Sequence, residues 1–523
     1  MNDSTPIRPE QLLARLRDPS FYSHPVSAVE LVETHISWIF LAGDFAYKLK
    51  KPLDLGFLDF STLEKRRFYC QEELRLNRRF APQLYLEVIA LGGRGNEIRP
   101  GGEPVCDYLI KMKRFPARNQ LDRMLADGRL TARHIRMFAE RIAEIHAQSP
   151  SASVQSGFGT PESIIAPVLE NFTQIRPVLP DGEQLRQIDH LENWCRESSE
   201  RFRETFEQRR VDGHVRECHG DVHLGNMAWF EEQPLLFDCI EFSENLRWID
   251  TVNDIAFLAM DLDDRKEGLL GWSFLNDYLR ASGDYPGTAL LAYYQVYRAL
   301  VRAKVTSLRL TQTGLSRAER QKDQELVHGY LDLAGRYVQP RQPRLVITHG
   351  LSGAGKSCLA RQLAPRCKGI CVHSDLERKR LHGISPEGRS DSPVAGGIYS
   401  RRSGVQTYRR LTELADGLLA TGITTIVDAT FLSHSDRQRM ARLAERHQVP
   451  LTILHFVVPE KELRKRIRIR AKAGKDPSEA NEWVLDYQLA NAEPLSIAEL
   501  GRTIRVRPDT PVDLLVREIN AEQ

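Results

Sequence analysis

The spacing of hydrophobic and polar residues changes along the chain and predicts a change of architecture. SWIFLAGDFAYKLKK (37–51) alternates as two strands around a tight Ala-Gly-Asp turn, and YLIKMKRF (108–115) predicts a further strand. From 120 to 215 apolar residues recur mostly at helical spacing, which returns in DTVNDIAFLAMDL (250–262) and LLAYYQVYRALVRAKV (290–305). The pattern predicts a small sheet-containing lobe followed by a larger helical lobe.

A polar break follows the last of these helices. Residues 316–337 keep helical spacing, and VQPRQPR (338–344) then brings two prolines three residues apart, which cannot continue a helix. Beyond it, apolar strand candidates alternate with helical stretches, which predicts a parallel sheet covered by helices. These candidates are LVITHG, GICVHSD, TTIVDAT and LTILHFVV. We therefore predict one domain over 1–337, a linker over 338–344 and a second domain over 345–523.

Composition narrows the class of protein. At 523 residues the chain is too long for one core, and 41% hydrophobic with 27% charged residues is ordinary for a soluble globular protein. A net charge of +3 disfavours nucleic-acid or membrane binding over the whole surface. We find no signal-like start and no apolar run of the ~18 residues that a membrane span needs. Eight cysteines without a CxxC pair favour reduced thiols in a cytoplasmic protein.

The segment CHGDVHLGNM (218–227) contains residues that suit phosphoryl transfer. Asp221 and Asn226 lie five residues apart, the spacing of a kinase catalytic loop, in which the aspartate accepts a hydroxyl proton and the asparagine binds metal. Asp238 ends the apolar strand LLFDCIEF twelve residues later and can bind a second face of the metal ions. Because these ligand atoms are all oxygen, they predict Mg²⁺.

HGDxHxxN followed by an apolar strand and Asp resembles the aminoglycoside phosphotransferase family, relatives of the protein kinases, over roughly residues 30–335. The resemblance implies an α+β bilobal kinase-like fold with ATP between the lobes. It also implies a strand lysine for the α- and β-phosphates, for which we prefer Lys48 over Lys50, and a helical carboxylate that holds it, for which we prefer Glu73 over Glu72. Two departures are the absence of a GxGxxG loop before the lysine and Asp-Cys-Ile in place of Asp-Phe-Gly.

GLSGAGKS (350–357) matches the P-loop pattern GxxxxGK[ST] directly after an apolar strand. Gly350, Gly353 and Gly355 let backbone N–H groups curl around phosphates, and the following helix directs its positive end at them. Lys356 is predicted to reach the β- and γ-phosphates, and Ser357 to bind Mg²⁺. Asp428, which follows four mostly apolar strand residues in TTIVDAT, is predicted as a second metal ligand in a Walker-B-like position, with a helix-capping role as the alternative.

Asp375 and Arg378 suggest the class of P-loop enzyme. Asp375 follows a second strand and can take the proton from an acceptor hydroxyl, while Arg378, one helical turn on, can hold an anionic group. This D-x-x-R resembles the polynucleotide kinase and zeta-toxin-like branch of P-loop kinases over about residues 344–500. Residues 461–475 hold eight lysines and arginines against one glutamate. We predict a lid there, with Arg466 and Arg470 stabilising the transferring phosphate, and a nucleic-acid backbone patch as the alternative.

Together these parts predict a bifunctional ATP- and Mg²⁺-dependent phosphotransferase, each domain acting on a hydroxyl, with a small molecule as the favoured acceptor and no membrane partner. Three alternatives stay open. The first domain is a nucleotide-gated regulatory module without turnover, the second is a nucleic-acid 5′-hydroxyl kinase, or the second is a toxin that phosphorylates a nucleotide sugar. The sequence indicates neither acceptor nor oligomeric state.

Overall fold

The structure, a computed structural model, describes residues 9–56, 58–180, 182–312, 314–385, 388, 390, 396–473 and 481–521. The chain forms two compact units. One spans Met1–Arg141, Ile145–Pro167 and Phe202–Leu258, and the other spans Ile142–Glu144, Val168–Arg201 and Ala259–Gln523. The predicted linker 338–344 lies between α12 (Arg317–Tyr337) and β11 (Leu345–His349) and has no helix or strand. The two-domain fold class is confirmed, with a kinase-like fold first and a P-loop kinase fold second. The exact domain boundaries stay a prediction.

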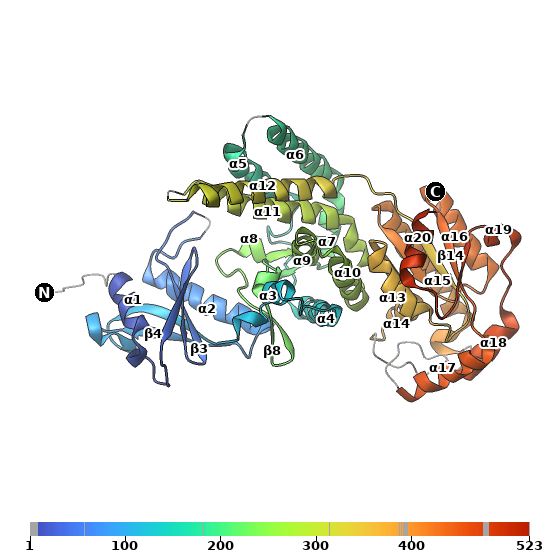
Figure 1. Ribbon diagram of the computed structural model, residues 1–523, viewed down its shortest axis with the longest axis horizontal. Helices are drawn as coiled ribbons and strands as arrows, with labels where there is room; N and C mark the ends of the chain where they lie inside the picture. Colours follow the sequence, from blue (N-terminus) through green and yellow to red (C-terminus); the bar gives the residue numbers. More distant parts are fainter. Residues whose placement is uncertain are drawn as a thin grey trace. The chain divides into compact units, whose positions relative to one another are not determined.

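The first unit begins with an antiparallel sheet of order β1-β2-β3-β6-β4-β5 (Figure 1). The predicted strands within 37–51 and 108–115 are confirmed. Gly43 lies in the turn between the two strands of 37–51 and has a φ of 57°, in the left-handed region that glycine tolerates. The six strands are β1 (Val29–Glu33), β2 (Ser37–Ala42), β3 (Phe45–Lys50), β4 (Tyr85–Gly92), β5 (Arg99–Pro100) and β6 (Val105–Lys113).

The two faces of this sheet carry different side chains because strand residues alternate. Tyr47 and Leu49 of β3 join a core with Leu12 and Leu16 of α1 (Pro9–Arg17). Ala46 faces the other way, in a core that includes Cys70 of α2 (Leu63–Phe80). Lys48 and Lys50 have the same parity as Ala46, so β3 presents both lysines on the side that α2 covers.

The catalytic-loop segment of the first unit lies between short antiparallel strands. β7 (Val215–Glu217) pairs with β10 (Trp248–Asp250), and β8 (Met227–Phe230) pairs with β9 (Gln233–Leu236). The loop 218–226 therefore begins at the end of one strand pair and ends at the start of the other, which fixes both of its ends.

Helices make up most of the chain from residue 121 to the linker, as the spacing predicted. They are α3 (Leu121–Ala126), α4 (Ala132–Gln148), α5 (Pro161–Ile175), α6 (Glu183–Arg201), α7 (Arg203–Val211), α8 (Glu244–Arg247), α9 (Thr251–Asp264), α10 (Gly268–Ser282), α11 (Leu291–Leu310) and α12 (Arg317–Tyr337). Short 3₁₀ turns are η1 (Pro19–Phe21), η2 (Gly95–Glu97), η3 (Ala117–Asn119), η4 (Arg176–Val178), η5 (Leu224–Asn226), η6 (Tyr285–Leu290) and η7 (Gly397–Tyr399).

The second unit contains a parallel sheet of order β12-β13-β11-β14-β15, which confirms the predicted parallel pairing (Figure 1). Its strands are β11 (Leu345–His349), β12 (Gly369–His373), β13 (Thr424–Asp428), β14 (Leu451–Phe456) and β15 (Thr503–Val506). The helices are α13 (Lys356–Arg366), α14 (Ser374–Leu381), α15 (Arg401–Ala420), α16 (His434–His447), α17 (Glu460–Ala473), α18 (Glu482–Asn491), α19 (Ile497–Leu500) and α20 (Val512–Ala521).

Both faces of the parallel sheet are buried. Val346 packs in a core with Leu363 of α13 and Leu515 of α20, while its neighbours Leu345 and Ile347 point the other way and are equally buried. A parallel sheet covered on both faces directs the carboxyl ends of its strands at one edge, where P-loop proteins bind ligands. No helix within the described ranges is long and apolar enough to cross a membrane.

Candidate active sites

Lys48, the predicted phosphate-binding lysine, contacts two carboxylates of the first candidate site. Its Nζ donates to Oε1 of Glu73 at 2.8 Å and to Oδ1 of Asp238 at 2.5 Å. Burial alone would lower the pKa of Lys48, but the two carboxylates raise it well above its usual range. The lysine is thus a fixed cation beside the predicted metal ligand Asp238. Glu72, the alternative anchor, instead pairs with Arg75.

Lys50 was the alternative to Lys48, and both lysines contact Glu73. Lys50 Nζ donates to Oε2 of Glu73 at 2.6 Å and also to Glu241. All three side chains are almost fully buried, so each charge requires its partners. Glu241 was not predicted, because a contact between residues 191 positions apart leaves no local sequence pattern. The one sequence signal for Glu241 is its position three residues after the predicted metal ligand Asp238.

Asp221 and Asn226 are brought together at the start and end of the catalytic loop. Asn226 Nδ2 donates to Asp221 Oδ2 at 2.8 Å and to the Asp221 carbonyl at 3.1 Å. The Asp221 side chain is 35% exposed, so the carboxylate remains accessible to an acceptor. His223 Nε2 lies 3.5 Å from the same carboxylate oxygen. The pair therefore combines an accessible base with an amide whose Oδ1 is oriented by the Nδ2 bonds.

Asp254 fixes the backbone of this loop from behind. Its carboxylate accepts the N–H of His219 at 3.0 Å and the N–H of Gly220 at 2.9 Å, and His146 Nε2 lies 3.2 Å away. Gly220 has a φ of 84°, and a Cβ there would lie 2.5 Å from the Leu246 carbonyl oxygen. His146, Cys218 and Asp254 are the one cluster with metal-ligand spacing in the described part of the chain, but these hydrogen bonds already occupy both oxygens of Asp254.

Asp238 has a backbone φ of 64°, and its N–H donates to the Tyr85 hydroxyl at 3.2 Å. Aspartate adopts the left-handed region more readily than most residues, and the turn directs its carboxylate away from the strand. The carboxylate of Asp238 and the amide oxygen of Asn226 are hard ligands of the kind Mg²⁺ prefers. Because the Asp238 side chain is 48% exposed, it has room for a metal beside Lys48. The residues thus fit the predicted ion.

The second candidate site is the P-loop between β11 and α13. Gly350, Gly353 and Gly355 all have positive φ values, of 150°, 83° and 93°. A Cβ on Gly353 would lie 3.1 Å from Ile467 and 3.2 Å from a backbone oxygen of α17, so the loop lies close against that helix. Lys356 begins α13, and its Nζ donates to the Leu351 carbonyl at 2.8 Å. The amides of the first helical turn therefore face the phosphate position.

The charge of Lys356 is set by burial and by the acids near it. Burial lowers the pKa of Lys356 to about 8, and Asp428 and Asp375 partly oppose this. Burial would raise the pKa of Asp428, but its hydrogen bonds with His373 and Ser357 and the charge of Lys356 lower it overall. His373 Nδ1 donates to Asp428 Oδ2 at 2.9 Å. Ser357 and Asp428 thus lie side by side as oxygen donors, which fits Mg²⁺.

Asp375 and Arg378 are adjacent on α14. Arg378 Nη1 lies 3.4 Å from Asp375 Oδ1, and the guanidinium lies over the Tyr399 ring at 4.9 Å. The Nε of Arg378 is buried and has no hydrogen-bond partner within the described residues. The site therefore places the partly exposed carboxylate of Asp375, which lies near Lys356, beside the Arg378 guanidinium, whose Nε donor is unused within the described residues.

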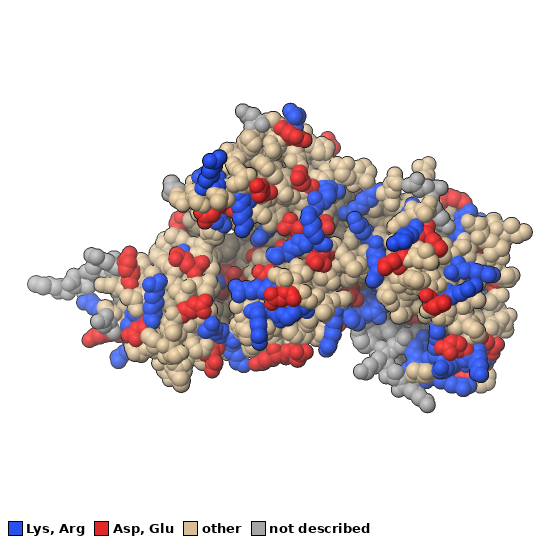
Figure 2. Space-filling view, viewed as in Figure 1, with Lys and Arg blue, Asp and Glu red and all other residues tan. Residues whose placement is uncertain are grey.

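The arginines of α17 lie at the P-loop. Arg466 Nη1 is 3.9 Å from the position of a Cβ on Gly355, and the charge of Arg470 helps to lower the pKa of Lys356. Arg466 Nε also pairs with Glu462 at 2.8 Å, and two further arginines of the basic run are paired: Arg464 with Glu460 and Asp486, and Arg468 with Glu482. Figure 2 shows acidic and basic side chains interspersed at the lower right, where Figure 1 places α17 and α18. Residues 474 and 475 of the run lie outside the described residues.

Comparisons with known proteins match each of the two domains. The family model "Phosphotransferase enzyme family" matches residues 69–293, and the model "AAA domain" matches residues 345–495. Both domains are of phosphotransferase families. Solved structures include amicoumacin kinase hAmiN in complex with AMP-PNP, Ca²⁺ and Ami, at 12% identity over 62% of this chain and 96% of that one, TM-score 0.40. A gluconokinase from Sinorhizobium meliloti 1021 is 23% identical over 34% of this chain and 90% of that one, TM-score 0.25.

The fold and the two family matches define a two-domain phosphotransferase. Proteins described as "Uncharacterized protein Rv2004c" of Mycobacterium tuberculosis (strain ATCC 25618 / H37Rv) and "Uncharacterized protein Mb2027c" of Mycobacterium bovis (strain ATCC BAA-935 / AF2122/97) are 31% identical over 431 residues. The alignment covers 81% of this chain and 83% of each relative. The chain belongs to the family of these mycobacterial proteins, whose similarity runs through both domains.

Proposed function

We propose that the protein is a bifunctional, ATP- and Mg²⁺-dependent kinase with two active sites, each transferring the γ-phosphate to a hydroxyl of a small molecule. One observation carries the proposal. Each domain holds its own separate set of a buried lysine, oxygen-bearing side chains beside it and a partly exposed aspartate. A domain that only bound nucleotide would have no use for the aspartate.

In the first site the roles follow from the contacts. Lys48, held by Glu73, binds the nonreacting phosphates, and Asn226 and Asp238 hold the metal. When bound, magnesium neutralises charge on the phosphate oxygens. Asp221 accepts the proton of the attacking hydroxyl, because Asn226 orients its carboxylate and leaves it exposed.

In the second site the P-loop amides and Lys356 bind the phosphates, and Ser357 and Asp428 hold the metal. Asp375 is the general base, since it lies near enough to Lys356 to raise the pKa of that lysine. Arg466 and Arg470 of α17 meet the charge that develops on the transferring group. Each side chain thus has one role, as expected for phosphoryl transfer, which needs few residues for positioning and charge stabilisation.

The surroundings of Asp375 favour a small acceptor with an anionic group. Arg378 offers an unpartnered Nε beside Asp375, and a guanidinium stacked on Tyr399 is preorganised to bind a carboxylate or phosphate. A nucleic-acid acceptor is less favoured, because Glu460, Glu482 and Asp486 neutralise much of the basic run that would bind a phosphate backbone.

A test of the first site uses a protein whose second site is disabled. ADP release from ATP in the presence of small-molecule extract is measured for Lys356→Ala, and for Lys356→Ala combined with Asp221→Asn. Arg361→Ala, an exposed cation on α13, is the matched control. We expect ADP release to survive Lys356→Ala and to fall about 10²–10⁴-fold when Asp221→Asn is added. Loss of all ADP release with Lys356→Ala alone would leave the first domain as a regulatory module.

A further inference from the structure

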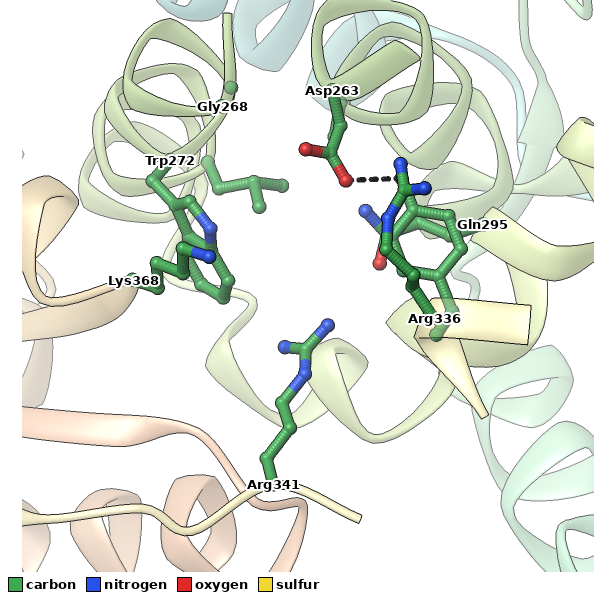
Figure 3. A pocket seen from close by; sticks show the side chains of 11 residues that line it. Asp263, Gly268, Trp272, Gln295, Arg336, Arg341 and Lys368 are labelled. Atoms are coloured by element: carbon green, nitrogen blue, oxygen red, sulfur yellow. Dashed lines mark hydrogen bonds between the residues drawn. The ribbon is translucent and has the colours of Figure 1, made fainter. Parts of the chain in front are cut away.

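A cavity of about 260 Å³ lies in the second unit, and its lining includes none of the residues predicted for either active site. Its wall is formed by the first turn of α10, by α11, by the end of α12 and by the chain leading into β11 and β12 (Figure 3). The lining side chains that matter here are Asp263, Trp272, Gln295, Arg336, Arg341 and Lys368. None of them has a part in the proposed phosphoryl transfer.

The cavity has an excess of positive charge. Arg336, Arg341 and Lys368 line it against the single carboxylate of Asp263. None of these three cations makes an ion pair or side-chain hydrogen bond within the described residues, and the Arg341 guanidinium lies over the Trp272 ring at 5.6 Å. Stacking on the indole holds that guanidinium in place without using its N–H donors.

The positive end of α10 adds to this field. Gly268 and Gly271 of the first turn line the cavity, and the helix has no side-chain cap at Glu267. The N–H groups at the start of a helix lack internal partners and favour an anion. Three cations and a helix start that face one cavity are the elements of a phosphate site.

The cavity is also lined by two hydrogen-bond acceptors, Gln295 Oε1 and the Asp263 carboxylate, which can accept from a ligand N–H or O–H. Gln295 is only 6% exposed, and its Oε1 has no hydrogen-bond partner among the described residues. A buried carbonyl oxygen without a partner costs free energy that a ligand N–H or O–H would recover. Asp263 is a second acceptor, fixed in place by the Tyr337 hydroxyl, which donates to its Oδ2 at 2.9 Å. In Figure 3 Asp263, Gln295 and the cations surround the same space.

We propose that this cavity binds a small phosphorylated molecule that also carries a hydroxyl or amine, at a third ligand site distinct from both active sites. The phosphate contacts Arg336, Arg341, Lys368 and the start of α10, and the hydroxyl or amine donates to Gln295 and Asp263. The volume is below the roughly 300 Å³ at which pockets for larger ligands begin, so the ligand has the size of a sugar phosphate. The site lies against β12, because Asn276 of α10 hydrogen-bonds the backbone of Gly369 and Cys371.

The test is equilibrium dialysis of labelled orthophosphate against the full-length protein, with both nucleotide sites saturated by magnesium and AMP-PNP. Methyl phosphate, ribose 5-phosphate and phosphoethanolamine then compete with the label. Methyl phosphate as its monoanion or dianion brings no additional hydroxyl or amine, whereas the other two do. The variants are Arg341→Ala with Lys368→Ala, and Gln295→Leu, each checked for an unchanged melting temperature. Lys322→Ala, an exposed cation on α12, is the matched control.

We expect saturable orthophosphate binding that weakens roughly tenfold for each cation removed and is unchanged in Lys322→Ala. Ribose 5-phosphate or phosphoethanolamine should displace the label better than methyl phosphate, and Gln295→Leu should abolish that advantage. The proposal is overturned by the absence of saturable binding or by binding that survives loss of both cations. It is also overturned if methyl phosphate competes as well as the other two. Arg341 and Lys368 are exposed, so their removal leaves the core intact.

Discussion

Replacing Glu73 with glutamine removes the one carboxylate that is bound to both buried lysines of the first site. Its two oxygens accept from Lys48 at 2.8 Å and from Lys50 at 2.6 Å, and its side chain is fully buried. Glutamine keeps the shape but not the charge, so the two buried ammonium groups lose a shared counterion. We expect the sheet and α2 of the first unit to be destabilised.

The size of this destabilisation follows from the lowered pKa of Glu73, which keeps its carboxylate charged. Burial alone would raise its pKa, but Lys48 and Lys50 lower it from 4.5 to about 2. That shift corresponds to about 3 kcal/mol, which agrees with the roughly 3–5 kcal/mol measured when one partner of a buried pair is removed. Because the folded-state pKa lies below the unfolded one, this stability is present above about pH 4.5 and is lost as pH falls toward 2.

Hydrogen exchange with mass spectrometry measures this effect in the intact protein. Protection of peptides from β3 and α2 should fall about 100-fold in Glu73→Gln at neutral pH. Peptides from β11 and α13 should stay protected and serve as an internal reference. Glu72→Gln is the control, because Glu72 forms a partly exposed pair with Arg75 whose loss costs under about 1 kcal/mol. Equal protection in the two variants would refute the reasoning.

Three further predictions concern the two sites. Burial holds the pKa of Lys356 at about 8, below its ordinary 10.5, so nucleotide phosphates should draw a proton back onto it. Nucleotide binding to the second site should therefore take up a proton at pH 8.5 and weaken as pH rises. Calorimetry in buffers of different ionisation enthalpy measures this uptake, and binding without proton uptake would contradict the prediction. Gly220→Ala should lower transfer by the first site roughly 10²-fold by displacing the loop, while the second site keeps its rate; an unchanged first-site rate would show that the loop tolerates a Cβ. Arg470→Ala should lower kcat of the second site roughly 10²–10³-fold with little change in KM for ATP, and an equal change in both would make it a ground-state binding residue.

Local patterns were sufficient to predict much of the fold and one contact within the first candidate site. The strands around Gly43 and the parallel strand LVITHG followed from residue spacing alone, because alternation and buried runs report directly on a sheet. Asp221 and Asn226 were predicted to act together, and the structure puts them in contact because five residues span one short loop.

Contacts between distant residues could not be predicted in the same way. The sequence favoured Lys48 but could not exclude Lys50, because both lie on one strand face. The contacts with Asp238 and Glu241 distinguish them: Lys48 reaches the predicted metal ligand Asp238, and Lys50 reaches Glu241. Gln295 and Lys368 belong to elements that carry no motif, so nothing in their spacing indicated a shared cavity.

The central claim is that one chain holds two active kinases, and partition of labelled phosphate tests it most directly. γ-labelled ATP is added to cell extract, which is then separated into metabolite, nucleic-acid and protein fractions, for wild type, Asp221→Asn and Asp375→Asn. We predict that each substitution removes a different labelled species from the metabolite fraction and leaves the other at its wild-type level. If Asp375→Asn abolished all transfer while Asp221→Asn changed nothing, the chain would hold one kinase and the account would be wrong.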